Sequence, residues 1–120
     1  MLPLDNKSVL IVEDEPFIAF DLADAMTDAG ATVMGPALTM REAGDALDGA
    51  TPNMACLDIN IGADLIWPIA QRLRDDGVPF VFVSAQSKQS DLPAPFGGYQ
   101  CIAKPASQAD LISKLSALKS

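Results

Sequence analysis

The stretch that decides the fold is SVLIVEDEP, residues 8–16. Its first part, residues 8–12, is an almost continuously apolar run, which is typical of a parallel strand covered by helices on both faces. Three acidic residues follow, and Pro16 stands where the first turn of a helix tolerates proline. The stretch therefore predicts a buried strand that leads through acidic residues directly into a helix.

Short apolar runs and helical patterns continue to alternate to the end of the chain. Further strands are expected at residues 31–35, 54–57, 80–83 and 99–103, and further helices after Thr39, over 66–73 and after Ser107. Strands that alternate with helices form a parallel sheet with helices on both faces, so the fold class is α/β. Segment 86–98 is the exception, because Pro93 and Pro95 would both break a helix there. We expect at most one short turn in that segment, followed by a loop.

Length and composition narrow the class of protein further. A chain of 120 residues, 49% of them hydrophobic, suits a single domain spanning residues 1–120. Its net charge of −8 argues against binding to nucleic-acid phosphates. The chain has no apolar run of membrane-spanning length and no secretory signal pattern, so we expect a cytoplasmic protein without membrane contact. The absence of histidine argues against most zinc sites and against a Ser-His-Asp triad.

Polar residues follow the carboxyl ends of four predicted strands. Glu13 and Asp14 follow the first strand, Asp58 the third, Ser84 the fourth and Lys104 the fifth. These ends meet at one edge of a parallel sheet, which is where ligands bind in open α/β folds. Three neighbouring carboxylates repel one another, and bound Mg²⁺ would offset that repulsion. A carboxylate beside Mg²⁺ and a lysine can act as a nucleophile toward a phosphoryl group.

Each of these residues also has an ordinary structural explanation. The acids after the first strand could stabilise a helix N-terminus, and Asp58 could form a turn. Ser84 could satisfy nearby backbone groups, and Lys104 could be a solvated surface charge. Their joint placement at one sheet edge favours the functional interpretation over these separate ones.

Four motifs resemble the receiver domain of two-component response regulators, and together they span essentially the whole chain in order. They are VLIVEDEP (9–16), CLDINI (56–61), FVSA (82–85) and AKPA (103–106). The resemblance implies a flavodoxin-like, doubly wound sheet of five parallel strands in the order 2-1-3-4-5. The fourth helix of that fold would be short or irregular here.

The resemblance also implies a magnesium site. Asp14 would ligate Mg²⁺ directly, and Glu13 would assist directly or through water. Asp58 and the backbone carbonyl of Asn60 would supply further ligands.

The resemblance implies three roles in phosphoryl transfer. Asp58 would accept a phosphoryl group from a phosphohistidine of a histidine kinase or phosphotransfer protein. Lys104 would pair with a phosphoryl oxygen, and the Ser84 hydroxyl would turn onto the phosphoryl group. Pro105 would follow a cis peptide bond, as is common in this family.

Two departures from the family pattern concern how the signal leaves the site. Cys101 replaces the aromatic residue that usually precedes the lysine by three positions, and it is open whether Tyr99 substitutes for that residue. Residues 80–86 also resemble a receiver subgroup with a PFxFATG-type fourth strand and atypical switching. With the implied strand order, Cys56 and Cys101 would lie about 10 Å apart, too far for a disulfide, so we expect buried reduced thiols.

The leading hypothesis is a stand-alone receiver that signals through protein–protein contacts in a phosphorelay. It would be a signalling domain rather than an enzyme, a monomer or weak dimer, with a downstream protein as its target. The alternative is a pseudo-receiver, a protein-binding module without a working phosphorylation switch. A phosphatase with an aspartyl nucleophile is disfavoured, because Asn60 stands where a general acid would be needed.

Overall fold

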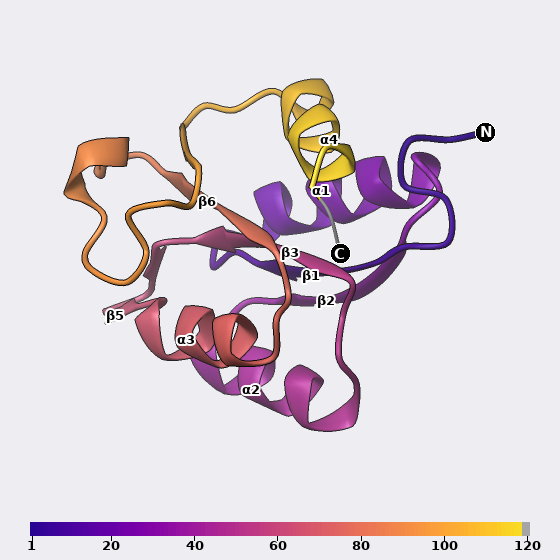
Figure 1. The fold of residues 1–120 in the computed structure, drawn as a ribbon. Coiled ribbons are helices and arrows are strands. Elements are labelled where there is room, and N and C mark those ends of the chain that lie inside the picture. The colour runs from indigo at the N-terminus through magenta and orange to yellow at the C-terminus, as the bar shows by residue number, and fades with distance from the viewer. Residues whose placement is uncertain (119–120) are drawn as a thin grey trace.

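The computed structural model describes residues 1–118, which alternate between strands and helices along their whole length (Figure 1). The strands of the central sheet are β1 (Ser8–Val12), β2 (Thr32–Ala37), β3 (Met54–Asp58), β6 (Phe80–Ser84) and β7 (Cys101–Ala103). The helices are α1 (Pro16–Asp28), α2 (Met40–Gly49), α3 (Trp67–Asp75) and α4 (Gln108–Ser116). A hairpin of β4 (Asn60–Ile61) and β5 (Asp64–Leu65) precedes α3, and a short 3-10 helix, η1 (Gln89–Asp91), follows β6.

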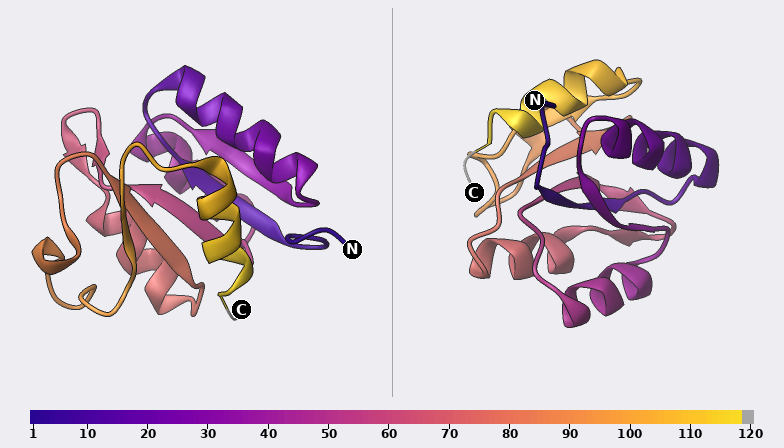
Figure 2. Two further views of the ribbon diagram at one scale, coloured as in Figure 1. Left: turned by 90° about the horizontal axis from the view of Figure 1, so that it is seen from above. Right: turned by 90° about the vertical axis from the view of Figure 1, so that its right-hand side faces the viewer.

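The sheet is parallel throughout and has the order β2-β1-β3-β6-β7. This order is the predicted 2-1-3-4-5 arrangement, so the flavodoxin-like α/β fold is confirmed. Figures 1 and 2 show α1 and α4 on one face of the sheet and α2 and α3 on the other. All five strands end at the same edge, and this edge carries the residues of interest.

The core consists of two apolar layers, one on each face of the sheet. Every residue of β3 and β6 is buried, as expected for central strands covered on both sides. Neighbouring residues of β1 point to opposite faces: Leu10 packs in the layer under α2 and α3, and Ile11 in the layer under α1 and α4. Two covered faces explain why these strands read as continuous apolar runs.

Local signals in the sequence account for how two helices begin. The Thr39 hydroxyl accepts a hydrogen bond from the Glu42 N–H (3.0 Å), and the Glu42 carboxylate accepts one from the Leu38 N–H (2.8 Å). This reciprocal cap starts α2. Ser107 caps α4 in the same position, accepting from the Asp110 N–H at 3.0 Å.

Several elements differ in extent from the prediction, among them β3 and β6, which run one residue further, to Asp58 and Ser84. Strand β2 continues beyond residue 35 to Ala37, through the cis Gly35–Pro36 bond. Strand β7 begins at Cys101 rather than at residue 99, and the Tyr99 N–H instead donates to the Phe96 carbonyl in a turn. The β4–β5 hairpin was not predicted, because strands of two residues leave no periodic pattern.

Segment 86–98 forms no helix beyond the short η1, as predicted, but its loop contains two further hydrogen-bonded turns, in which the Phe96 N–H donates to the Pro93 carbonyl and the Tyr99 N–H to the Phe96 carbonyl. The loop is held by aromatic packing rather than by a helix. Phe96 is buried, stacks on Trp67 at 5.5 Å and meets Phe82 edge-on at 5.8 Å. Trp67 therefore has a packing role.

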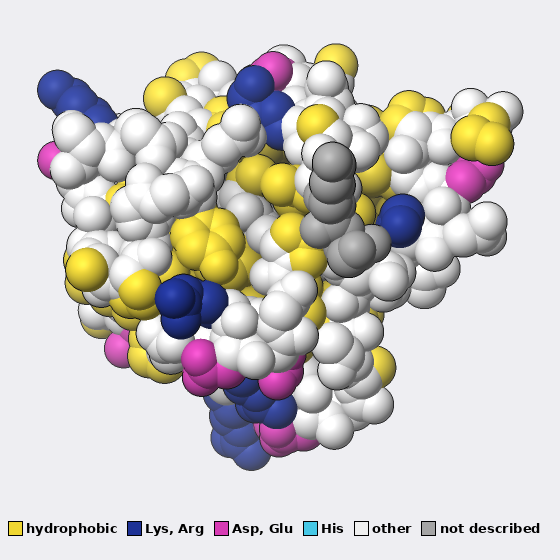
Figure 3. All heavy atoms as spheres, in the orientation of Figure 1, with side chains coloured by type: hydrophobic (Ala, Val, Ile, Leu, Met, Phe, Trp, Pro, Cys, Tyr) yellow, Lys and Arg dark blue, Asp and Glu magenta, His cyan; other side chains and the backbone are white. Residues whose placement is uncertain are grey.

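Charged side chains gather at the lower edge of the face seen in Figure 3, over α2 and α3. There Arg72 of α3 pairs with Asp48 of α2 at 2.6 Å, and both side chains are exposed. Exposed pairs of this kind contribute little to stability. In residues 1–118, no helix combines the length and the apolar character needed to cross a membrane.

Candidate functional site

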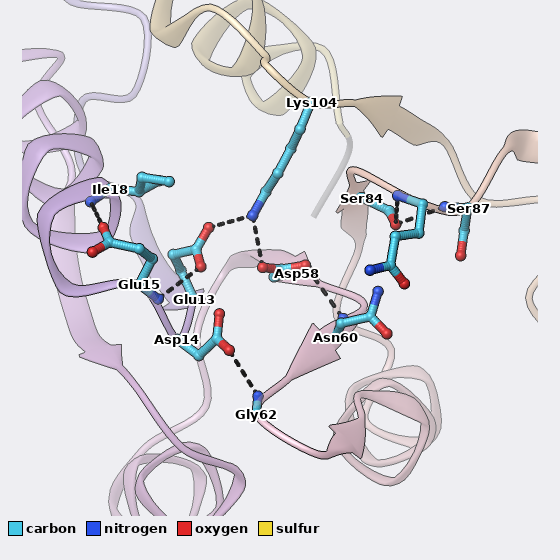
Figure 4. Close-up of polar contacts among 11 residues, drawn as sticks. Glu13, Asp14, Glu15, Ile18, Asp58, Asn60, Gly62, Ser84, Ser87 and Lys104 are labelled. Carbon is cyan, nitrogen blue, oxygen red and sulfur yellow. Dashed lines mark hydrogen bonds and ion pairs between the residues drawn. The ribbon is translucent and has the colours of Figure 1, made fainter.

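The structure brings the predicted residues together at the carboxyl edge of the sheet (Figure 4). Glu13 directly follows β1, Asp58 is the last residue of β3, Ser84 is the last residue of β6, and Lys104 directly follows β7. Glu13, Asp58 and Ser84 are the three buried polar residues of the described chain, with exposed fractions of 4%, 6% and 1%. Burying two carboxylates is costly unless they are paired.

Lys104 supplies that pairing. Its Nζ lies 2.6 Å from Glu13 Oε1 and 2.7 Å from Asp58 Oδ2, so one ammonium bridges two carboxylates (Figure 4). The Lys104–Pro105 bond is cis, as expected, and the Lys104 N–H donates to the Ser84 carbonyl at 2.9 Å. The position of the ammonium therefore depends on the pairing of β7 with β6.

The titration of these groups follows from their burial and contacts. Burial raises the pKa of the Glu13 carboxyl, and the hydrogen bonds from Glu15 and Lys104 only partly oppose this effect. Burial alone would lower the pKa of Lys104, but its hydrogen bonds to Asp58 and Glu13 outweigh burial, and the pKa is raised. Lys104 is therefore firmly protonated at neutral pH.

Asp14 is the exposed member of the acidic group. Its Oδ2 accepts a hydrogen bond from the Gly62 N–H at 2.8 Å, which ties the β4–β5 hairpin to the start of α1. Gly62 has a φ of +60°, a left-handed conformation that favours glycine. The β4–β5 hairpin, which was not predicted from the sequence, thus fixes the position of the Asp14 carboxylate.

Glu13, Asp14 and Asp58 form a group of carboxylates that could hold a metal ion. One carboxylate oxygen from each of the three lies within 4.8 Å of the others. Hard oxygen donors and an open side where Asp14 meets solvent fit Mg²⁺, which retains several waters when bound. The Asn60 N–H donates to Asp58 Oδ1 at 3.3 Å, and the metal-binding role of the Asn60 carbonyl stays a prediction.

Ser84 is turned away from Asp58 in this structure. Its Oγ accepts hydrogen bonds from the N–H groups of Gln86 (3.1 Å) and Ser87 (2.9 Å), so the hydroxyl fixes the start of the following loop (Figure 4). This is the backbone-satisfying role that sequence analysis gave as the structural explanation. A movement of the hydroxyl toward Asp58 would break both of these bonds.

Gln89 is a residue that sequence analysis missed. Its side-chain amide donates to the Tyr99 carbonyl (2.5 Å) and accepts from the Cys101 N–H (2.8 Å). It thereby pairs with the outer edge of β7 as a neighbouring strand would. A glutamine in a loop carries no local signal for such a contact across 12 residues of chain.

The two cysteines are free thiols in different surroundings. Cys56 is buried in β3, whereas Cys101 is only half-buried, contrary to the expectation that both would be buried. The Cys101 Sγ lies 3.8 Å from the carbonyl oxygen of Ser87. The N–H of the same Ser87 donates to the Ser84 hydroxyl. The Tyr99 ring is stacked on Phe80 at 4.1 Å.

Comparison with known proteins agrees with this geometry. The family model for the response regulator receiver domain matches residues 9–116. No curated protein sequence matches the chain.

Solved structures share the fold. The PhyR receiver domain of Erythrobacter litoralis aligns with a TM-score of 0.79 and 23% identity, covering 93% of this chain and 88% of that one. PhyR of Brucella abortus aligns with a TM-score of 0.77 and 25% identity, over 92% of this chain and 46% of that one. A mutant of the anti-anti-sigma factor PhyR from Bartonella quintana gives a TM-score of 0.76 and 24% identity, over 95% and 50% of the two chains. The match across residues 9–116 and the shared fold show that this chain belongs to the family of response regulator receiver domains.

Proposed function

We propose that this receiver domain accepts a phosphoryl group on Asp58, with Mg²⁺ held by Glu13, Asp14 and Asp58, and that it signals through protein contacts. The observation that carries the proposal is the Lys104 ammonium, which bridges Asp58 and Glu13 beside the exposed Asp14 carboxylate. Receiver domains as a family are signalling domains that typically bind Mg²⁺ at an acidic pocket.

The reaction requires one bond to form and one to break. An Asp58 carboxylate oxygen attacks phosphorus, the P–N bond of a phosphohistidine breaks, and its electron pair stays on the departing imidazole nitrogen. Bound Mg²⁺ would supply positive charge that offsets the charge on the transferring oxygens. Lys104 already lies within hydrogen-bond distance of Asp58 and supplies a second positive charge. The acceptor ends β3, and the ammonium and the other proposed metal ligands follow β7 and β1 within two residues, so the sheet places these groups close together before the reaction.

The phosphoryl donor we propose is a histidine kinase or a phosphotransfer protein. The apolar side chains of Phe17, Ile18 and Phe20 on α1 are exposed, and so is that of Leu65 in the hairpin. Helix α1 starts directly after the acidic residues of the site, and the hairpin is bonded to Asp14. Such exposed apolar side chains beside the reacting group suit a protein partner. We propose a further protein as the downstream target, cytoplasmic residence, and a monomer or weak dimer for the domain.

The test is the intact mass of the protein after incubation with acetyl phosphate and Mg²⁺. We expect one added phosphoryl group in the wild type and in Asp64→Asn, an exposed aspartate outside the acidic group. We expect no adduct in Asp58→Asn and none without Mg²⁺. An adduct that persists in Asp58→Asn would remove Asp58 from its proposed role.

The second candidate function is a pseudo-receiver that binds a partner without a phosphorylation switch. It is favoured by the Ser84 hydroxyl, which is bonded to Gln86 and Ser87, and by Cys101 at the usual aromatic position. Amide hydrogen exchange over residues 84–104 separates the two functions. A working switch alters exchange there upon phosphorylation, and a pseudo-receiver shows the same exchange with and without the phosphoryl group.

A further inference from the structure

A cavity of about 190 Å³ lies beside the acidic site, on the sheet face that α1 and α4 cover. Ile18 and Leu22 of α1 form one wall, Cys56 and Val83 of the central strands form the floor, and Ala106 and Leu111 close the other side. Figures 1 and 2 show α1 and α4 on this face, and α4 follows the chain after β7. The geometry points to a binding cavity for a small, uncharged apolar molecule behind Lys104.

The polar end of the cavity is formed by ion-paired side chains. Glu13, Asp58 and Lys104 form this end, and they are already bonded to one another. Among residues 1–118, no buried side-chain nitrogen or oxygen lacks a hydrogen-bond partner. Apart from this end the walls are apolar, and contact with apolar walls favours an apolar occupant. Such an occupant would lie against these walls and leave the ion pairs in place.

The cavity is connected to the surface. Ile18, Leu22, Ala106 and Leu111 also line a second, shallower hollow together with Asp21 and Gln108. Asp21 and Gln108 are exposed residues of α1 and α4, so the connection runs out between these two helices. A small molecule can enter without unfolding the sheet.

Size and charge define the class of ligand. A dry apolar cavity of about 150 Å³ is enough to hold benzene, so 190 Å³ suits a single ring or a short branched chain. The volume is below the roughly 300 Å³ at which pockets for drug-sized ligands begin. Without bound Mg²⁺, Glu13, Asp58 and Lys104 together carry a net negative charge that disfavours an anion, and the apolar walls offer no partner for one.

The proposal does not depend on phosphorylation of Asp58. It concerns the apolar walls of the cavity. Lys104 lies at the polar end, where it is ion-paired with Glu13 and Asp58. An occupant would contact Pro105 and Ala106, which directly follow Lys104, and so would lie against the segment that places the ammonium.

The experiment is titration of the intact protein, with its methyl groups labelled for NMR, with toluene as the probe and benzoate as a matched anionic control. With toluene we expect saturable shifts in the methyl groups of Leu22, Val83 and Leu111, with a Kd on the order of 1 mM or below. The methyl groups of Leu47 and Leu73, in the layer under α2 and α3, should not move. Benzoate should leave all of them unchanged.

Two variants locate the binding. Ala106→Leu fills the cavity entrance with an isobutyl group and should weaken toluene binding about tenfold or more. Ala109→Leu makes the same change on an exposed residue of α4 outside the cavity and should leave binding unaltered. The proposal is overturned if toluene shifts both layers alike, if benzoate shifts the same methyl groups, or if a folded Ala106→Leu binds as the wild type does. If Ala106→Leu does not fold, the wild-type pattern of shifts decides.

Discussion

Lys104→Met tests whether the ammonium is what makes the buried acids tolerable. Methionine keeps a long apolar side chain but carries no charge. The change leaves Glu13 and Asp58, whose side chains are 5% and 7% exposed, without the cation that lies 2.6 and 2.7 Å from them. The fold itself should survive, because the sheet and both apolar layers are untouched.

The expected loss of stability can be worked from the burial of the three groups. Removing one partner of a buried ion pair costs about 3–5 kcal/mol. The Lys104 side chain is 21% exposed, so water reaches this site in part, and we expect about 2–4 kcal/mol at neutral pH. This is a large part of the roughly 5–15 kcal/mol by which a domain is stable.

The loss should shrink in acid. Burial raises the pKa of Glu13 in the folded wild type, and removal of the ammonium raises that pKa further. A raised acid pKa means that the folded chain binds a proton more readily than the unfolded chain. Stability is therefore gained as the pH falls through the folded pKa toward 4.5, and lost as the pH rises back through it.

Urea denaturation measures the effect, with the m-value as a check that unfolding stays two-state. The matched control is Lys114→Met, whose exposed i,i+4 pair with Asp110 at 3.5 Å should contribute only about 0.3–0.5 kcal/mol. Mg²⁺ at one hundred times its Kd should raise the free energy of unfolding of Lys104→Met by about 2.7 kcal/mol. If Lys104→Met is no less stable than Lys114→Met, the proposed role of the ammonium is refuted.

Three further predictions concern other parts of the molecule. Gln89→Ala removes the side-chain hydrogen bonds to Tyr99 and Cys101, so the Cys101 amide should exchange faster with solvent. The free energy of unfolding should fall by about 0.5–1.5 kcal/mol per lost hydrogen bond. Unchanged exchange of the Cys101 amide would contradict the proposal that Gln89 pairs with β7 as a strand would. A water-soluble thiol reagent should label Cys101 in the native protein but not Cys56, because Cys56 is buried and its burial raises the pKa of the thiol to about 12. Mass spectrometry of the labelled peptides measures this difference. Equal labelling of the two cysteines would argue against the burial of Cys56. Thr39→Ala should lower stability by about 1 kcal/mol in thermal unfolding, and an unchanged midpoint would mean that the cap on α2 contributes nothing.

The sequence predicted the parts of the fold and site that depend on periodicity and on chain direction. Apolar runs such as residues 80–83 located the strands. Parallel strands put their carboxyl ends at one edge, so Glu13, Asp58 and Lys104 were expected to meet there, and the structure brings them together. The expected break at Pro93 and Pro95 was also confirmed.

The remaining features depend on side-chain contacts that leave no pattern in a single sequence. The bond from Gly62 to Asp14 joins residues 48 positions apart, and the hairpin behind it is too short to be periodic. The Ser84 hydroxyl could turn toward Asp58 or toward the following loop. The path of that loop, which places the Ser87 N–H at 2.9 Å, determines that it faces the loop. The cavity beside Cys56 is a matter of packing volumes, which the residue types alone do not determine.

The order in which the chain is synthesised gives the Lys104 contacts another consequence. Lys104 lies 91 residues after Glu13 and 46 residues after Asp58. During synthesis from the N-terminus, β1 and β3 are therefore made, with their acids, well before the ammonium exists. The last strand, β7, has only three residues, and Lys104 directly after it supplies the charge that pairs with the two acids. Nascent chains that stop short of Lys104 carry the full repulsion of the acidic group, and adding divalent cations to such truncated chains should favour their folding.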